Sequence, residues 1–198
     1  VAVLFAAALE WFGRSYPKYR RAMLTMVAVL LIAELLPAPL TLHSAAVPNF
    51  YHRVAAAAGD VCVLELPTGI RDGASSVGNF SARSQYFQTM HGKPLIGGYL
   101  SRVSQERKSE VRRIDMIDAL IVLSERGTIS AEREAALVAS GPMFVNDANL
   151  GFVVVDRLRS SRALVYFAMG AVRLQRVEVD GKFALYDPSR SQQVFPRE

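Results

Sequence analysis

The chain has 198 residues, of which 51% are apolar and 21% are charged, and its formal net charge is +5. This length leaves room for one globular domain of about 150 residues beside an apolar segment. The bases form no stripe interleaved with aromatic residues, so we expect no nucleic-acid partner. The single cysteine, Cys62, excludes an internal disulfide.

Residues 1–42 contain two apolar runs with a basic loop between them. The second run, 22–42, holds one charged residue, Glu34, among its 21 residues. As a helix rising about 1.5 Å per residue, it would reach roughly 31 Å, the thickness of a bilayer's hydrocarbon core. We therefore predict a membrane segment with a truncated transmembrane helix over 1–12, a basic loop over 13–21 and a complete transmembrane helix over 22–42. The lipid bilayer is then a partner.

The basic loop predicts how this segment is oriented. Its bases are Arg14, Lys18, Arg20 and Arg21, without an acidic residue. Short basic loops remain on the cytoplasmic side, so residues 43–198 are expected to be extracytoplasmic at the inner (plasma) membrane. A carboxylate in hydrocarbon is costly unless it faces other helices, and Glu34 therefore predicts neighbouring helices. Because the chain begins inside an apolar run, we expect a C-terminal fragment whose N-terminal transmembrane bundle precedes Val1.

Two other interpretations of the second apolar run remain open. In the first, it is a secretory signal peptide with Ser44 and Ala46 at the positions that precede a cleavage site. In the second, residues 22–36 alone form a buried helix of a soluble core. A signal peptide does not carry a preceding apolar run, and this run favours the membrane segment.

The next part of the chain alternates between extended and helical patterns. Residues 61–67 are β-branched and almost continuously apolar, as in a buried strand that ends at Pro67. The stretch 68–79 is rich in Gly, Ser and Asp and is expected to be a loop. Helices are predicted over 49–58, 80–90, 110–126, 130–140 and 162–169, and Gly141 with Pro142 is expected to end the fourth.

Strands also close the chain. One is predicted over 151–157, and a hairpin is predicted from 173–180 and 182–188, joined near Asp180 and Gly181, a pair suited to a type I′ turn. Strands separated by helices and followed by an antiparallel pair predict an α/β fold. We expect a mostly parallel small sheet with flanking helices and a C-terminal β-hairpin.

The residues best suited to chemistry lie in the segment 84–102. The candidates for substrate binding there are Tyr86, Gln88, His91, Lys93, Tyr99 and Arg102. We expect His91 and Lys93 to lie at the mouth of the sheet, beside the Pro67 end of the first strand. Structural alternatives stay open, since the histidine can fix a turn, the cations can face water and the tyrosines can pack.

Glu65 is the seventh candidate. A carboxylate inside an apolar strand must find a polar partner. The predicted partner is Arg102 or His91.

No catalytic constellation is visible. The three histidines, His43, His52 and His91, lie far apart and no HExxH or CxxC motif occurs, so we expect no metal site. A phosphate-binding loop and a GxSxG elbow are equally missing from the sequence. We expect no catalytic residue and no cofactor in this chain.

The succession LELPTG, YFQTMHGKPLIGGYLSR, GFVVVD and VDGKFALYDP resembles the outer C-terminal domain of bacterial polytopic membrane proteins of the GT-C glycosyltransferase-like type. The resemblance extends over residues 22–188. It implies a membrane part that binds a polyprenyl-phosphate sugar and carries a catalytic acidic residue in an outward loop, a region that no residue of this chain matches. It also implies that this chain, inactive alone, positions an acceptor or closes over the active site.

Three functions follow from the sequence. The favoured one is the accessory outer domain of a lipid-phosphate-sugar-dependent glycosyltransferase. The second is a membrane-tethered extracytoplasmic binding or interaction module without catalytic activity. The third, an autonomous periplasmic hydrolase, requires a catalytic cluster that the sequence does not show.

Overall fold

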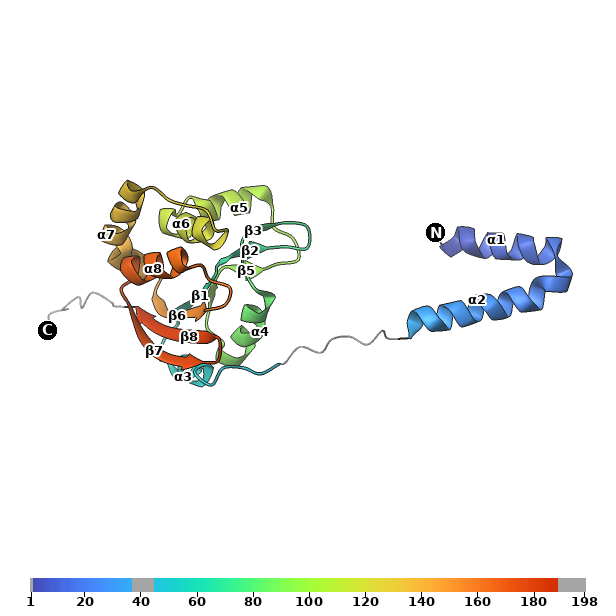
Figure 1. The fold of residues 1–198 in the computed structure, drawn as a ribbon, viewed down its shortest axis with the longest axis horizontal. Helices are drawn as coiled ribbons and strands as arrows, with labels where there is room; N and C mark the ends of the chain where they lie inside the picture. Colours follow the sequence, from blue (N-terminus) through green and yellow to red (C-terminus); the bar gives the residue numbers. More distant parts are fainter. Residues whose placement is uncertain (1, 37–44, 189–198) are drawn as a thin grey trace. The chain divides into compact units, whose positions relative to one another are not determined.

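The computed structural model describes residues 2–36 and 45–188. The chain divides into two compact units, Val1–Ala45 and Ala46–Glu198 (Figure 1).

The first unit is a helical hairpin. Helix α1 (Ala2–Ser15) and helix α2 (Arg20–Leu35) are joined by a single 3-10 turn, η1 (Pro17–Tyr19). Pro17 suits the first position of that turn, because its fixed φ favours a helical start and its missing N–H has no partner to lose there.

The predicted transmembrane helices are not supported. Within residues 2–36 and 45–188, every helix is too short or too polar to cross a membrane. Helix α2 begins at Arg20 and ends at Leu35, so it is shorter than the helix predicted over 22–42. The end of that prediction, residues 37–42, and Ser44 of the signal-peptide alternative lie outside the described residues.

The second unit is built on a five-stranded sheet. Its strand order is β4 (Leu95–Ile96), β1 (Cys62–Leu66), β6 (Leu150–Asp156), β8 (Phe183–Pro188) and β7 (Leu174–Asp180) (Figure 1). The first three strands are parallel, whereas β8 runs antiparallel to both β6 and β7. The α/β class is confirmed, but the sheet is mixed rather than mostly parallel, because the C-terminal hairpin joins it through β8.

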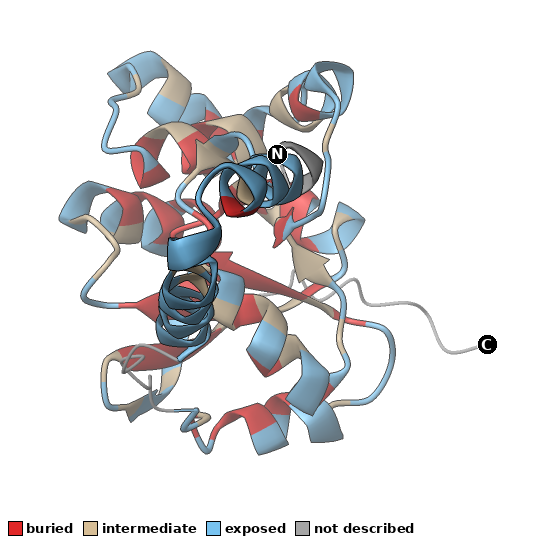
Figure 2. Cartoon of the chain, turned by 90° about the vertical axis from the view of Figure 1, so that its right-hand side faces the viewer, coloured by how far each residue is buried: buried red, intermediate tan, exposed pale blue. Residues whose placement is uncertain are grey.

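Helices cover both faces of this sheet. One face packs against α6 (Asp115–Ser124), α7 (Ala131–Asp147) and α8 (Arg162–Ala171), and its core includes the fully buried Leu64, Leu120 and Leu164. The buried residues lie in the strands and on the sheet-facing sides of these helices (Figure 2).

The opposite face is covered by two helices, α3 (Tyr51–Ala56) and α4 (Ala82–His91). Phe87 of α4 packs there against Tyr51 and Phe183. Because successive side chains of a strand alternate between faces, Glu65 points to this α3–α4 side while Leu64 and Leu66 point to the other.

A second, three-stranded sheet lies next to the end of β1. It has the order β3 (Ser76–Gly78), β2 (Gly69–Arg71), β5 (Gly98–Tyr99), with β2–β3 antiparallel and β2–β5 parallel. The sequence predicted a loop over 68–79, where β2 and β3 lie. The glycine that looked like a loop signal is needed for close pairing, since a Cβ at Gly69 would lie 2.2 Å from the Val77 carbonyl oxygen.

Two helix predictions had wrong boundaries. The helix predicted over 110–126 is divided between α5 (Gln105–Arg112) and α6, with Ile114 extended at the junction (φ −85°, ψ 104°). Helix α7 continues through Pro142, because the turn beyond it buries Phe144 and Val145 in the core. Tertiary packing thus overrides the local tendency of proline to end a helix.

The hairpin turn also differs in type. Asp180 pairs with Phe183, which leaves Gly181 and Lys182 as the two loop residues. Gly181 has a φ of 56°, and Lys182 is not among the residues with positive φ. A type I′ turn needs positive φ at both central positions, so that prediction was wrong.

Candidate functional site

The structure places His91 and Lys93 at the amino ends of the parallel strands, whereas Pro67 lies at the carboxyl end of β1. Helix α4 carries the chain back from the end of β1, and His91 is its last residue. The next strand then starts parallel to β1, with the Val63 N–H donating to the Pro94 carbonyl oxygen at 2.8 Å. The expected position beside Pro67 was wrong, because a crossover helix between parallel strands returns the chain to their amino ends.

His91 is buried at this end of the sheet. Its side chain is 4% exposed, its Nδ1 accepts from the Lys93 backbone N–H at 3.0 Å, and its ring stacks on Tyr51 with 5.3 Å between centroids. Nε2 has no hydrogen-bond partner within the described parts of the chain. Burial, reinforced by Lys93, lowers the pKa of His91 to about 4.

We expect the protein to lose stability through His91 as the pH falls. In the unfolded chain the pKa of His91 is about 6.5, and above this pH the neutral ring makes its full contribution to the free energy of unfolding. This contribution is lost as the pH falls toward 4, because the unfolded chain binds the proton more readily than the folded chain. Replacing His91 with Phe removes this titration. The free energy of unfolding of the variant, relative to the unmodified protein, should rise as the pH is lowered from 6.5 to 4 in urea titrations. A constant difference across that range would contradict the assignment.

Glu65 is buried on the same face, and its predicted partner was wrong. Its Oε1 accepts from the Tyr51 hydroxyl at 2.7 Å, and the Ser84 side chain is a second hydrogen-bond partner. Burial raises the pKa of Glu65 despite these two donors, which favour the charged form. Tyr51 therefore lies between Glu65, which it hydrogen-bonds, and His91, on which it stacks.

Two further candidates bind backbone. The Gln88 side-chain amide donates to the Lys93 carbonyl oxygen at 3.1 Å. The Lys93 ammonium donates to the carbonyl oxygens of Ala57 and Gly59 at 2.7 and 2.8 Å. These contacts secure the turn before β4 to the end of α3.

The tyrosine candidates are on the surface. Tyr86 is 44% exposed on α4 and Tyr99 is 36% exposed on β5. The guanidinium of Arg71 lies 6.0 Å from the centroid of the Tyr99 ring. Both rings are accessible to a ligand.

Arg102 lines a separate cavity of about 590 Å³, which we call the Arg102 pocket. Its walls come from the loop after β2, the loop after β5 and the start of α5. The lining residues are Asp72, Gly73, Ala74, Ser75, Ser101, Arg102, Val103, Ser104, Gln105 and Lys108. Of the seven sequence candidates, Arg102 alone lies in this lining.

An ion pair between Asp72 and Lys108 forms the base of the pocket. Their charged atoms are 2.8 Å apart, and the side chains are 7% and 4% exposed. Lys108 also donates to the Ser75 hydroxyl. The hydrogen bond from Lys108, with others from the backbone N–H groups of Ala74 and Ser75, holds the pKa of Asp72 well below its usual range.

Asp72 also ties the two loops together. Its Oδ1 accepts from the backbone of its own loop, while its Oδ2 accepts from the Val103 backbone N–H at 3.3 Å. Sequence reasoning missed this residue and Lys108. The RDG turn was a weak signal for Asp72, but nothing distinguishes Lys108 from its charged neighbours in QERKSE.

The pocket is suited to binding polar anions. Serine hydroxyls and an amide from Gln105 can hydrogen-bond hydroxyl groups, and the Arg102 guanidinium can form a two-pronged contact with a phosphate. Throughout residues 2–36 and 45–188, no cluster of His, Cys, Asp and Glu side chains is suited to a metal ion.

Comparisons with protein-family models, with curated proteins and with solved structures found no match to this chain. Function is therefore inferred from the site.

Proposed function

We propose that residues 46–188 form the outer, ligand-binding domain of a membrane-bound protein of the GT-C glycosyltransferase-like type. In this proposal the Arg102 pocket binds the sugar and phosphate groups of a polyprenyl-phosphate sugar and holds them for transfer. No residue in the described ranges is assigned to bond cleavage.

The observation that carries the proposal is the chemistry of the Arg102 pocket. Arg102 is exposed, and no carboxylate of the described residues forms an ion pair with it. Beneath it, the charge of Lys108 is balanced by Asp72. The pocket thus offers one uncompensated guanidinium beside several hydroxyl groups, a pattern that complements a sugar phosphate.

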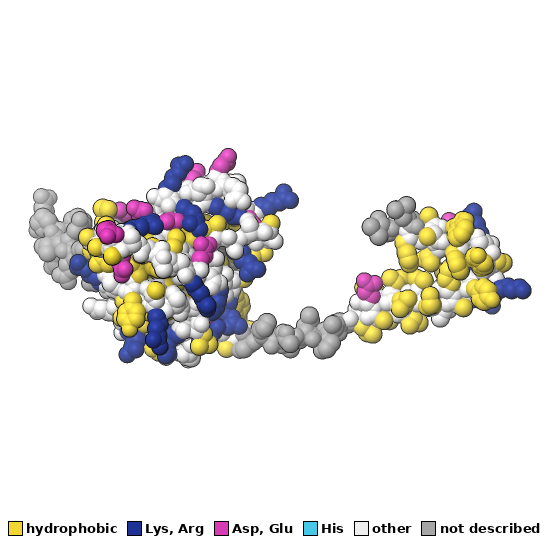
Figure 3. All heavy atoms as spheres, turned by 45° about the horizontal axis from the view of Figure 1, so that its top comes forward, with side chains coloured by type: hydrophobic (Ala, Val, Ile, Leu, Met, Phe, Trp, Pro, Cys, Tyr) yellow, Lys and Arg dark blue, Asp and Glu magenta, His cyan; other side chains and the backbone are white. Residues whose placement is uncertain are grey.

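The first unit supports a membrane location. Helix α2 has no buried residue, and large apolar side chains such as Val29, Ile32 and Leu35 are 59–80% exposed. Figure 3 shows apolar side chains over much of the visible face of the hairpin. A helix that is apolar all round is normally surrounded by lipid or by other helices, which supports a location at the inner membrane. The basic loop with Lys18, Arg20 and Arg21 supports the extracytoplasmic side for residues 46–188.

The proposal is tested by measuring the affinity of the full chain for glucose 1-phosphate in detergent by isothermal titration calorimetry. Arg102→Gln should weaken binding about tenfold, as expected for loss of a charge-assisted hydrogen bond. Arg107→Gln is the matched control, because this substitution removes the same charge at a different place. Arg107 is 70% exposed, pairs with Glu110 and lies outside the pocket lining.

Equal affinities of the two variants, or no binding by the unmodified chain at millimolar glucose 1-phosphate, would reject the pocket as the ligand site. A non-catalytic membrane-tethered module would bind in the same way. It differs in that the complete membrane protein would transfer no sugar from a polyprenyl-phosphate donor.

A further inference from the structure

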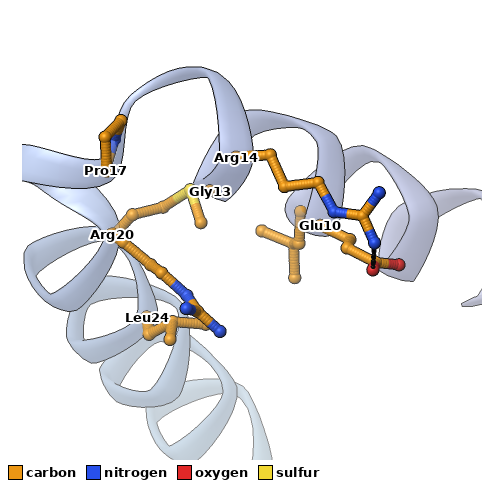
Figure 4. A pocket seen from close by; sticks show the side chains of 8 residues that line it. Glu10, Gly13, Arg14, Pro17, Arg20 and Leu24 are labelled. Carbon is orange, nitrogen blue, oxygen red and sulfur yellow. Dashed lines mark hydrogen bonds and ion pairs between the residues drawn. The ribbon is translucent and has the colours of Figure 1, made fainter.

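A second cavity, of about 710 Å³, lies inside the α1–α2 hairpin next to the η1 turn; we call it the hairpin cavity (Figure 4). It is lined by Leu9, Glu10, Gly13, Arg14, Pro17, Arg20, Met23 and Leu24. The lining has a charged part, formed by Glu10, Arg14 and Arg20, and an apolar part that includes Leu9, Met23 and Leu24.

Gly13 packs against Arg20 in the charged part of the lining. It is buried, and a Cβ at this position would lie 3.4 Å from Cγ and 3.8 Å from Nε of Arg20. The Arg20 side chain can therefore cross between the helices in close contact with the α1 backbone (Figure 4).

The cavity has one uncompensated positive charge. Arg14 forms an ion pair with Glu10 one turn earlier on α1, as the dashed line in Figure 4 shows. Among the described carboxylates, none pairs with Arg20. A ligand group with a single negative charge would balance the lining.

The surroundings of the cavity match the composition of a membrane interface. Trp11, Phe12, Tyr16 and Tyr19 are 38–67% exposed around the turn. Lys18 and Arg21 add two further exposed bases at the same level. Aromatic residues and bases gather where lipid head groups begin, whereas the arms of the hairpin beyond this level are apolar apart from Glu34.

We propose that the hairpin cavity binds the phosphate diester of an anionic phospholipid. Arg20 donates to the phosphate, and Leu9, Met23 and Leu24 contact the first carbons of an acyl chain. A phosphatidylglycerol head group carries one negative charge, which balances the positive charge of Arg20 that remains after Glu10 has paired with Arg14. This site is separate from the Arg102 pocket, and neither proposal depends on the other.

The test uses the single tryptophan of the chain, Trp11, as a fluorescent reporter beside the cavity. The full chain in neutral detergent is titrated with phosphatidylglycerol or phosphatidylcholine that carries brominated, quenching acyl chains. Saturable quenching should occur at lower concentrations of phosphatidylglycerol than of phosphatidylcholine. Inorganic phosphate should not compete at the same concentration, because it lacks the acyl contacts.

Two neighbouring bases provide matched variants. Arg20→Gln should weaken the binding of phosphatidylglycerol about twentyfold, since it removes both the general attraction and the direct hydrogen bonds. Arg21→Gln changes the net charge equally but lies outside the lining, so the loss should be about fivefold. Gly13→Leu should also weaken binding by filling the cavity, whereas Ala8→Leu, on an exposed position of the same helix, should not.

Three results would overturn the proposal. Equal losses for the Arg20 and Arg21 variants would show only general surface attraction. Equal quenching by the two lipids would show no selectivity for the anionic head group. Competition by inorganic phosphate would show a site for free anions. Circular dichroism of each variant checks that the hairpin keeps its helices, and Arg102→Gln should leave phosphatidylglycerol binding unchanged.

Discussion

Replacing Gly141 with alanine is expected to destabilise the second unit by about 3 kcal/mol or more, which would be a large effect for one methyl group. An ideal Cβ at this position would lie 1.6 Å from the Ala171 carbonyl oxygen, where α7 crosses the end of α8. The neighbouring atom is backbone, so relief requires the two helices to separate. Urea titration of the full chain, followed by far-ultraviolet circular dichroism, measures the loss.

Gly170→Ala is the matched control on the facing helix. Its added Cβ would lie 3.8 Å from a methyl group of Val138, an ordinary contact. Alanine has the higher helix propensity, so this variant should be unchanged or more stable by up to about 1 kcal/mol. Similar stabilities for the two variants would show that α7 and α8 do not cross as closely as described.

Replacing Tyr51 with phenylalanine is expected to cost about 1–3 kcal/mol, because it leaves the buried Glu65 side chain with one hydrogen-bond partner fewer. The Tyr51 hydroxyl donates to Glu65 Oε1 at 2.7 Å. Since the folded-state pKa of Glu65 is raised, the contribution of Glu65 to stability is complete below its unfolded pKa and is lost as the pH rises through the folded value. Without Tyr51 this loss should be larger.

The expected signature is therefore a difference in unfolding free energy that grows from acidic to alkaline pH. Tyr166→Phe provides the control, because Tyr166 is 74% exposed and should show no such trend. A Tyr51→Phe effect that does not vary with pH would mean that the hydroxyl contributes by packing rather than through the charge of Glu65.

The parts of the fold that the sequence predicted well are those where residues of one character form an uninterrupted run. Strands β1 and β6 lie within one residue of the predicted apolar stretches, and α8 begins at the predicted Arg162. Such runs are buried whatever their neighbours do, so local hydrophobicity is sufficient to predict them.

The errors arose where contacts distant in sequence decide the conformation. The stretch 68–79 forms strands because Gly69 and Gly78 allow two backbones to meet, although glycine alone indicates a loop. Pro142 is accommodated inside α7 because the following turn is buried. Neither partner is visible in a local window of sequence.

The candidate site could be predicted only in part for the same reason. Six polar residues in 84–102 were predicted to bind substrate, yet the side chains of Gln88 and Lys93 hydrogen-bond to backbone carbonyl groups. Of these six candidates, only Arg102 lines the pocket. Asp72 and Lys108 lie beside it there, although they are separated by 36 positions in the sequence. Composition can identify a segment rich in polar groups, but the direction of each side chain depends on the crossover that follows β1.

The small sheet has a practical consequence for engineering. Pairing of β2 with β5 joins the two loops that form the walls of the Arg102 pocket, and the ladder of the five-stranded sheet passes through neither loop. Loop length is tolerated at a low entropic cost when the ends remain fixed. Libraries that vary residues 73–75 in length and composition should therefore change which ligands the Arg102 pocket selects, while the five-stranded sheet folds as before. Asp72 is kept in these libraries, because it bonds to Val103 and Lys108 across the pocket.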